Sequence, residues 1–119
     1  MRSVLVVDGA NVVGARPDGW WKDRAGAARR LHEALLVADL PYDEVVLVLE
    51  GQAKAGVRAG RDGHVRVVHA PKDGDATIVA ECRAASATGG QVRVVTADRM
   101  LGARTGVTAL SPTWLLDQI

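Results

Sequence analysis

The stretch from Val4 to Gly14, VLVVDGANVVG, constrains the fold of this chain more than any other. Its four consecutive apolar residues, three of them β-branched, are too few for a helix and typical of a strand that is buried on both faces. The run ends at Asp8. An ionised carboxylate there loses hydration, which is costly unless a cation, donor groups or a metal ion replace the water. Because an ordinary strand-to-loop turn also uses Asp, Gly and Asn, this stretch alone leaves both interpretations open.

Short apolar runs alternate with amphipathic segments along the rest of the chain. We expect further strands at residues 45–49, 65–70, 91–96 and 107–110. Two helices are expected after the N-caps at Asp23 and at Asp73–Asp75. A short helix is expected to begin at Asp98, with Met100 and Leu101 facing inward, and a last helical turn is expected after Pro112. Residues 51–64 contain four glycines and no periodicity, so they are expected to form a long mobile loop.

This alternation predicts a single α/β domain over residues 1–119. The expected architecture is a three-layer sandwich, in which helices cover both faces of a central parallel sheet of about five strands. In such sheets, ligands bind beyond the carboxyl ends of the strands, where the strand order reverses. Four acids lie at or just after predicted strand ends, so we expect them to share one edge of the sheet: Asp8, Glu50, Asp75 and Asp98.

Composition excludes several classes of site. The single cysteine, Cys82, excludes an internal disulfide framework and a cysteine-based zinc site, and it is consistent with a reducing cytoplasm. The three histidines lack metal-ligand spacing. The first apolar run is too short for a signal peptide or a membrane span. We therefore expect a cytoplasmic protein with no membrane partner. The net charge of +1 gives no argument for a polyanion partner from the total alone.

Each of the four acids could simply cap a helix or face solvent. Several carboxylates in one crevice repel one another, however, and remain ionised together only if a cation neutralises them. Oxygen ligands without cysteine select Mg²⁺ or Mn²⁺, which can activate a water for attack on a phosphodiester. A haloacid-type phosphatase would usually carry a second acid where Ala10 stands, and no phosphate-binding glycine motif is present. A phosphatase acting on small substrates stays a third possibility.

Three segments resemble the acidic signatures of NYN domains, the YacP-like branch of the PIN-like ribonuclease superfamily. They are VVDGANVVG, GDATIV and VVTADRML, and the terminal SPTWLLDQI is also similar to that branch. The resemblance covers nearly the whole chain. It implies a PIN-like parallel sheet and endonucleolytic cleavage of RNA with Mg²⁺ or Mn²⁺. It also implies that Asp8, Asp75 and Asp98 are the catalytic, metal-binding acids and that Asn11 is the polar residue beside the first of them.

Two positions depart from the pattern of this family. Relatives often carry an acid where Ala76 stands, and some PIN domains carry one where Met100 stands. Glu50 or Asp73 are candidate additional acids that would compensate. The departures keep an alternative open, in which the chain is a catalytically weak or inactive RNA-binding or regulatory module of PIN-like fold.

RNA binding would depend on cations placed near the acidic edge, because contacts to the phosphate backbone supply most of the affinity. Trp20 or Trp21 could stack an unpaired base of single-stranded RNA, while at least one of them is expected to pack on the first helix. A homodimer or a regulatory protein partner stays open. The candidate RNA-binding residues are Arg16, Trp20, Lys22, Arg24, Lys54, Arg58, Arg61 and Arg99.

Overall fold

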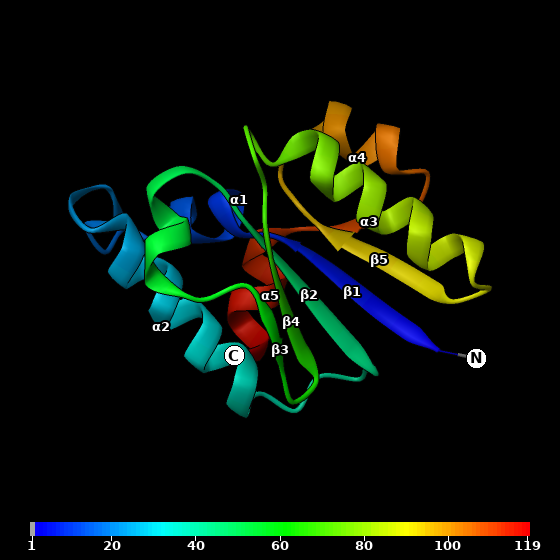
Figure 1. Cartoon of the computed structure of the whole chain (residues 1–119), viewed down its shortest axis with the longest axis horizontal. Helices are drawn as coiled ribbons and strands as arrows, with labels where there is room; N and C mark the ends of the chain where they lie inside the picture. Colours follow the sequence, from blue (N-terminus) through cyan, green and yellow to red (C-terminus); the bar gives the residue numbers. More distant parts are fainter. Residues whose placement is uncertain (1) are drawn as a thin grey trace.

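The computed structural model describes residues 2–119, and its strands form one mainly parallel sheet (Figure 1). The strands are β1 (Ser3–Asp8), β2 (Glu44–Leu49), β3 (Gly60–Asp62), β4 (Val65–His69), β5 (Gln91–Val95) and β6 (Thr108–Leu110). Their order is β3-β4-β2-β1-β5-β6, and β3 pairs antiparallel with β4 while the other pairs are parallel. The predicted α/β fold is therefore confirmed, with six strands in the described sheet instead of about five.

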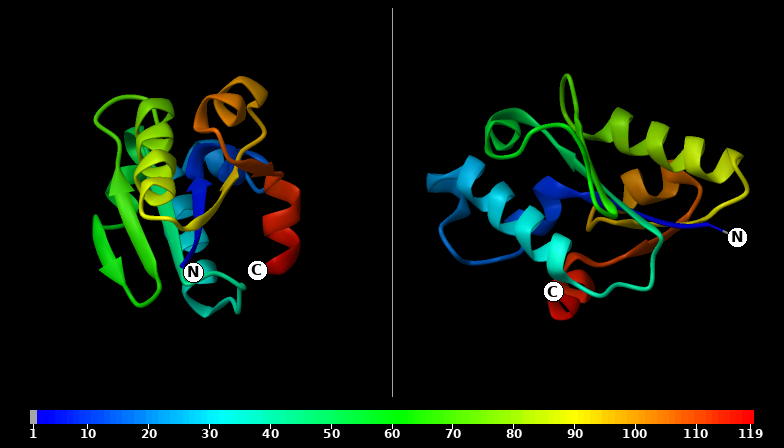
Figure 2. Two further views of the ribbon diagram at one scale, coloured as in Figure 1. Left: turned by 90° about the vertical axis from the view of Figure 1, so that its right-hand side faces the viewer. Right: turned by 60° about the horizontal axis from the view of Figure 1, so that its bottom comes forward.

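Helices cover both faces of the sheet. They are α1 (Gly9–Gly14), α2 (Arg24–Val37), α3 (Asp75–Ala87), α4 (Arg99–Thr105) and α5 (Pro112–Gln118), with 3₁₀ turns η1 (Trp20–Lys22) and η2 (Gly51–Gly56). One apolar core lies between the sheet and α1, α2 and α5, and a second lies between the sheet and α3 and α4. Figure 2 shows these two layers on opposite sides of the strands.

The position of β1 determines where a site can form. The chain runs outward from β1 to β2 and β4, and then crosses back over β1 to β5 and β6. The strand order therefore reverses beside β1. In open parallel sheets, ligands bind beyond the carboxyl ends of the strands at this reversal. Asp8 is the last residue of β1 and occupies that point.

Residues 51–64 do not form a loop without regular structure, so that prediction is wrong. They form η2 and β3, and two side chains attach this segment to the end of β4: Lys54 Nζ donates to the carbonyl oxygen of Ala70 over 3.0 Å, and His69 Nε2 lies 2.7 Å from the carbonyl oxygen of Val57. A Cβ on Gly56 would overlap the backbone carbonyl of Ala25. These contacts are between distant segments, which local periodicity cannot reveal.

The helix α1 was also not predicted, because its six residues are too few for a periodic signal. It begins directly after β1, and the close approach requires Gly9, since a Cβ there would lie 2.6 Å from the carbonyl oxygen of Val48. In α4, Leu101 is buried as expected, but Met100 is 79% exposed. The predicted inward orientation of Met100 is therefore wrong. No helix in residues 2–119 is both long enough and apolar enough to cross a membrane.

Three arginines surround one buried acid near the amino ends of the strands. Glu44 begins β2, and its side chain contacts Arg61 directly, Arg2 at 3.4 Å and Arg66 at 3.7 Å. Burial alone would raise the pKa of Glu44. The hydrogen bond from Arg61 and the positive charge of the three guanidiniums outweigh burial and hold the pKa of Glu44 below its usual value.

Replacing Glu44 by Gln is expected to lower the free energy of unfolding at pH 7 by about 1–3 kcal/mol, because the arginines lose their carboxylate. A carboxyl whose pKa is lower in the folded state stabilises the fold above its unfolded pKa, near 4.5, and this contribution is lost as the pH falls through the folded value. Urea unfolding of both proteins from pH 7 into the acid range measures the difference. The exposed Glu33→Gln is the control, and a difference that does not shrink in acid would contradict the assignment.

Candidate functional site

The buried carboxylate of Asp8 is held by hydrogen-bond donors from two elements. Asp8 is 4% exposed. Oδ2 accepts from Asn11 Nδ2 at 2.6 Å and from Thr96 Oγ1 at 2.9 Å, while Oδ1 accepts from the backbone N–H of Asn11 at 3.4 Å as the N-cap of α1. These donors offset the lost hydration. Asn11 therefore lies beside Asp8, in the position that the sequence motif led us to expect.

Thr96 is a residue of the site that the sequence analysis missed. It follows β5 and is 5% exposed. Its hydroxyl donates to Asp8 and accepts from the backbone N–H of Asp98 at 3.1 Å, so it connects the end of β1 to the start of α4. The sequence did contain a signal for this residue, namely a hydroxyl side chain directly after an apolar strand and two residues before an acid. The partner of the hydroxyl could not be predicted, because it depends on the pairing of β1 with β5.

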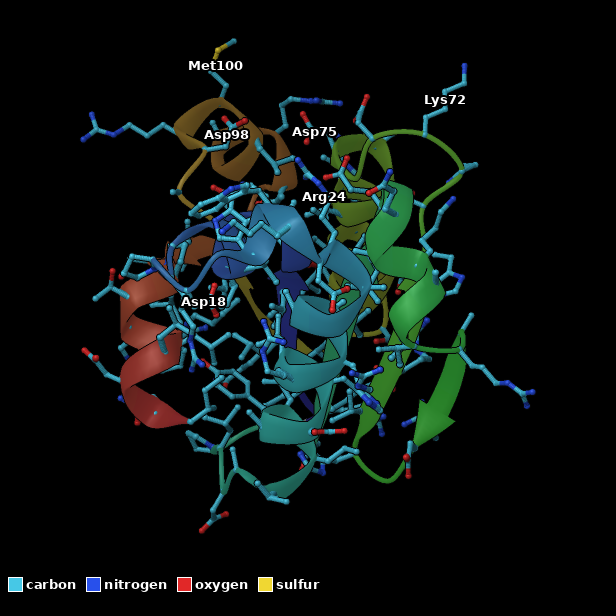
Figure 3. All side chains as sticks on the ribbon, turned by 90° about the vertical axis from the view of Figure 1, so that its left-hand side faces the viewer. Asp18, Arg24, Lys72, Asp75, Asp98 and Met100 are labelled. Carbon is cyan, nitrogen blue, oxygen red and sulfur yellow. The ribbon has the colours of Figure 1, made fainter. Side chains whose placement is uncertain are left out.

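The other two principal acids begin helices at the same edge of the sheet. Asp98 is exposed and caps α4, where its Oδ1 accepts from the N–H of Leu101 at 3.0 Å. Asp75 is half-buried in the first turn of α3, and its N–H donates to Oδ1 of Asp73 at 3.0 Å. Figure 3 shows Asp75 and Asp98 at one end of the molecule, with Met100 extending beyond them.

The pKa of Asp75 is raised above its usual value. Burial raises the pKa of Asp75, and the negative charges of Asp73, Asp98 and Asp8 raise it further. The charge of Arg104, which the sequence analysis did not single out, opposes this in part.

Glu50 belongs to the same group of carboxylates. Its pKa is raised by burial and by the charges of Asp8, Asp73 and Asp75, while a hydrogen bond from the backbone N–H of Gly74 acts in the opposite direction. The expectation that the four strand-end acids lie at one edge is therefore confirmed, and Asp73 joins them.

The donor set suits a hard cation that keeps much of its own water. It consists of oxygen atoms that carry an excess of negative charge, as Mg²⁺ and Mn²⁺ prefer. Within residues 2–119, no three side chains of the types His, Cys, Asp or Glu are arranged as a ready-made metal site. Cys82 is not a competing ligand, because burial and the charge of Glu81 raise its pKa to about 12.

The candidate RNA-binding residues fall into groups. Trp20 is half-buried, and the guanidinium of Arg24 lies 4.9 Å from its ring centroid, beside the acidic edge. Trp21 meets Trp20 edge-on and is 56% exposed, so one tryptophan packs and the other faces solvent. Arg99 is exposed and follows Asp98. Three further cations are exposed on neighbouring segments: Arg16, Lys22 and Arg58.

Two candidates are engaged elsewhere. Arg61 was expected on a loop near the acids. It lies instead in β3, where it contacts Glu44 near the amino end of β2. Lys54 lies in η2, and its ammonium donates to the backbone carbonyl of Ala70. The antiparallel pairing of β3 with β4 decides the position of Arg61.

The fold and the acidic edge together define an α/β protein compatible with a PIN-like sandwich: a mostly parallel sheet, helices on both faces, and carboxylates gathered where the strand order reverses. No family model matches the sequence, and no curated protein matches it. A similar solved structure is that of Rae1 (YacP) from Bacillus subtilis, determined as a W164L mutant.

That similarity extends over 97% of this chain and 73% of the Rae1 chain, with a TM-score of 0.60 and 18% sequence identity. At this identity the comparison shows the fold alone.

Replacing Thr96 by Val is expected to lower the free energy of unfolding by about 1–3 kcal/mol, because Asp8 loses a donor and the N–H of Asp98 loses its acceptor in a buried position. Valine has nearly the same shape, so the change isolates the hydroxyl. Thr96→Ser retains the hydroxyl and is the matched control. Urea unfolding checks the prediction, and equal losses for Val and Ser would contradict the proposed role of the hydroxyl.

Proposed function

We propose that this protein is a Mg²⁺- or Mn²⁺-dependent endoribonuclease that hydrolyses phosphodiester bonds of single-stranded RNA. The observation that carries the proposal is the gathering of carboxylates from separate strand ends around Asp8, close enough to raise the pKa of Asp75 and Glu50. Such a group needs a cation to stay ionised. The resemblance of the motifs to NYN domains and the fold shared with Rae1 (YacP) support the same conclusion.

In this proposal Asp8, Asp75 and Asp98 would hold the ion, partly through water, with Glu50 and Asp73 adding negative charge beside it. When bound, the ion would supply Lewis-acid polarisation of the phosphoryl group and a water activated for attack. Asn11 and Thr96 act as positioning residues, because their hydrogen bonds hold Oδ2 of Asp8 in one orientation.

The cations near the edge would guide the RNA backbone. Arg99 is exposed directly after Asp98, and Arg104 is close enough to Asp75 to oppose the rise of its pKa. Both are therefore placed to contact a phosphate at the edge. Arg16, Lys22 and Arg58 are exposed further out and would contact flanking phosphates. Arg61 has no part in this path, because its guanidinium is held by Glu44.

An RNA-binding or regulatory module without catalysis is the second candidate. It is favoured by the absence, within the described part of the chain, of three side chains arranged as a ready-made metal site. Two positions also lack a carboxylate: Ala76, where members of the resembled family often carry an acid, and the exposed Met100, where some PIN domains carry one. This module would bind single-stranded RNA and leave it intact in excess Mn²⁺.

Replacing Asp98 by Asn is expected to reduce cleavage of single-stranded RNA by about 100-fold or more, because one charge of the proposed ion site is lost. The fold should be retained, since Asn caps a helix as well as Asp does. Asp18→Asn makes the same charge change away from the edge and is the matched control (Figure 3). Labelled RNA incubated with Mg²⁺, Mn²⁺ or EDTA provides the measurement.

Metal binding is tested separately by thermal unfolding. Mn²⁺ should raise the midpoint for the wild type and Asp18→Asn, and raise it much less for Asp98→Asn, because an ion that binds only the folded state stabilises it. Cleavage that persists in EDTA, or that is unchanged in Asp98→Asn, would refute the proposal. RNA binding without cleavage in Mn²⁺ would establish the second candidate instead.

A further inference from the structure

A hollow of about 280 Å³ opens beside the acidic edge, between α1, η1, the start of α2 and η2. Its walls are mainly apolar and include Ala10, Val13 and Trp20. Three polar side chains also line it: Arg24, Glu50 and Gln52. Its volume is slightly below the roughly 300–1,000 Å³ of pockets for drug-sized ligands, so it suits one small ring system better than a folded segment of RNA.

The chemistry of the walls suits a nucleobase. Trp20 and the guanidinium of Arg24, which lies 4.9 Å from its ring centroid, offer planar groups on which a base can stack. The amide of Gln52 can both donate and accept hydrogen bonds, and the carboxylate of Glu50 can accept them, so the edge of the base also has partners. Together these groups provide the stacking and edge contacts by which proteins hold unpaired bases.

The hollow borders the proposed ion site through two residues. Gly9, which follows Asp8, forms part of its wall. Glu50 lines it too, and the charge of Asp8 contributes to the raised pKa of Glu50. A base seated here would therefore belong to a nucleotide close to the phosphate at the carboxylates. On the η2 side of the hollow, Gly56 lets η2 pack closely against Ala25 of α2.

We propose that this hollow is a binding subsite for one unpaired nucleobase next to the scissile phosphate, with Trp20 and Arg24 as the stacking surface and Glu50 and Gln52 at the edge of the base. The inference rests on the proposed function for the identity of the ligand as RNA. It adds that the enzyme cuts at a fixed distance from a base that it has taken out of the stack.

The test uses short fluorescent single-stranded RNAs in EDTA, so that binding is measured without cleavage. One RNA is intact, and the others each carry a single abasic ribose at a successive position. Trp20→Ala removes the stacking surface, and Trp21→Ala, its exposed neighbour outside the hollow, is the matched control. Ala10→Leu fills the hollow while leaving Trp20 in place, and Ala55→Leu on the exposed side of η2 is its control.

Fluorescence anisotropy should show that Trp20→Ala and Ala10→Leu each weaken binding of intact RNA by about fivefold or more, the effect of losing one stacked base. The two controls should stay within about a factor of two, because they lie outside the hollow. For the wild-type protein, an abasic ribose at one position of the RNA should weaken binding by a similar factor. The Ala10→Leu variant should bind this abasic RNA and the intact RNA equally well, because its hollow is already filled. Circular dichroism checks that each variant is folded, and Ala10→Leu decides the matter if Trp20→Ala does not fold.

Equal losses for Trp20→Ala and Trp21→Ala, or a wild type that tolerates every abasic position, would overturn the base subsite. This failure is distinguishable from failure of the nuclease proposal. RNA that is cut in Mn²⁺ without any dependence on a base would leave the nuclease standing and remove the subsite. RNA that is bound with one critical base, yet never cut, would leave the subsite standing and remove the nuclease.

Discussion

The burial of one carboxylate at the end of the central strand is the constraint on which the site depends. Asp8 is almost completely removed from solvent, and its charge is compensated by donors from Asn11 and Thr96 and by the first turn of α1. Those bonds fix α1 against β1 and, through Thr96, connect the end of β1 to the start of α4. The other acids lie at the same edge of the sheet. The charge of Asp8 is therefore among the causes that raise the pKa values of Glu50 and Asp75.

The pKa values of acids are shifted in opposite directions at the two ends of the sheet. At the amino end, Glu44 is surrounded by three guanidiniums, and its pKa is lowered. At the carboxyl end, burial raises the pKa values of Glu50 and Asp75, and the charges of neighbouring carboxylates raise them further. The chain has a net charge of only +1, so this difference comes from placement. The excess of negative charge at one edge is what makes a cation site there physically reasonable.

Much of the fold could be predicted because its signals are local. The continuous apolar runs of β1 and β2 mark strands that are buried on both faces, and Asp23 does cap α2 through the N–H of Gly26. Predictions were wrong where distant segments decide the structure. The glycine-rich residues 51–64 are ordered by contacts with α2 and β4, and α1 exists because Gly9 permits a close approach to β2.

The sequence by itself determined that several acids would stand at strand ends and that a parallel sheet would carry them, because strand runs and caps are written in consecutive residues. Only the tertiary structure decided which groups meet. Thr96 reaches Asp8 because β5 pairs with β1, Arg61 is drawn to Glu44 because β3 folds back on β4, and Met100 faces solvent because α4 buries Leu101 instead. These outcomes depend on strand order and helix rotation, and such long-range properties leave no mark in the local pattern of residues.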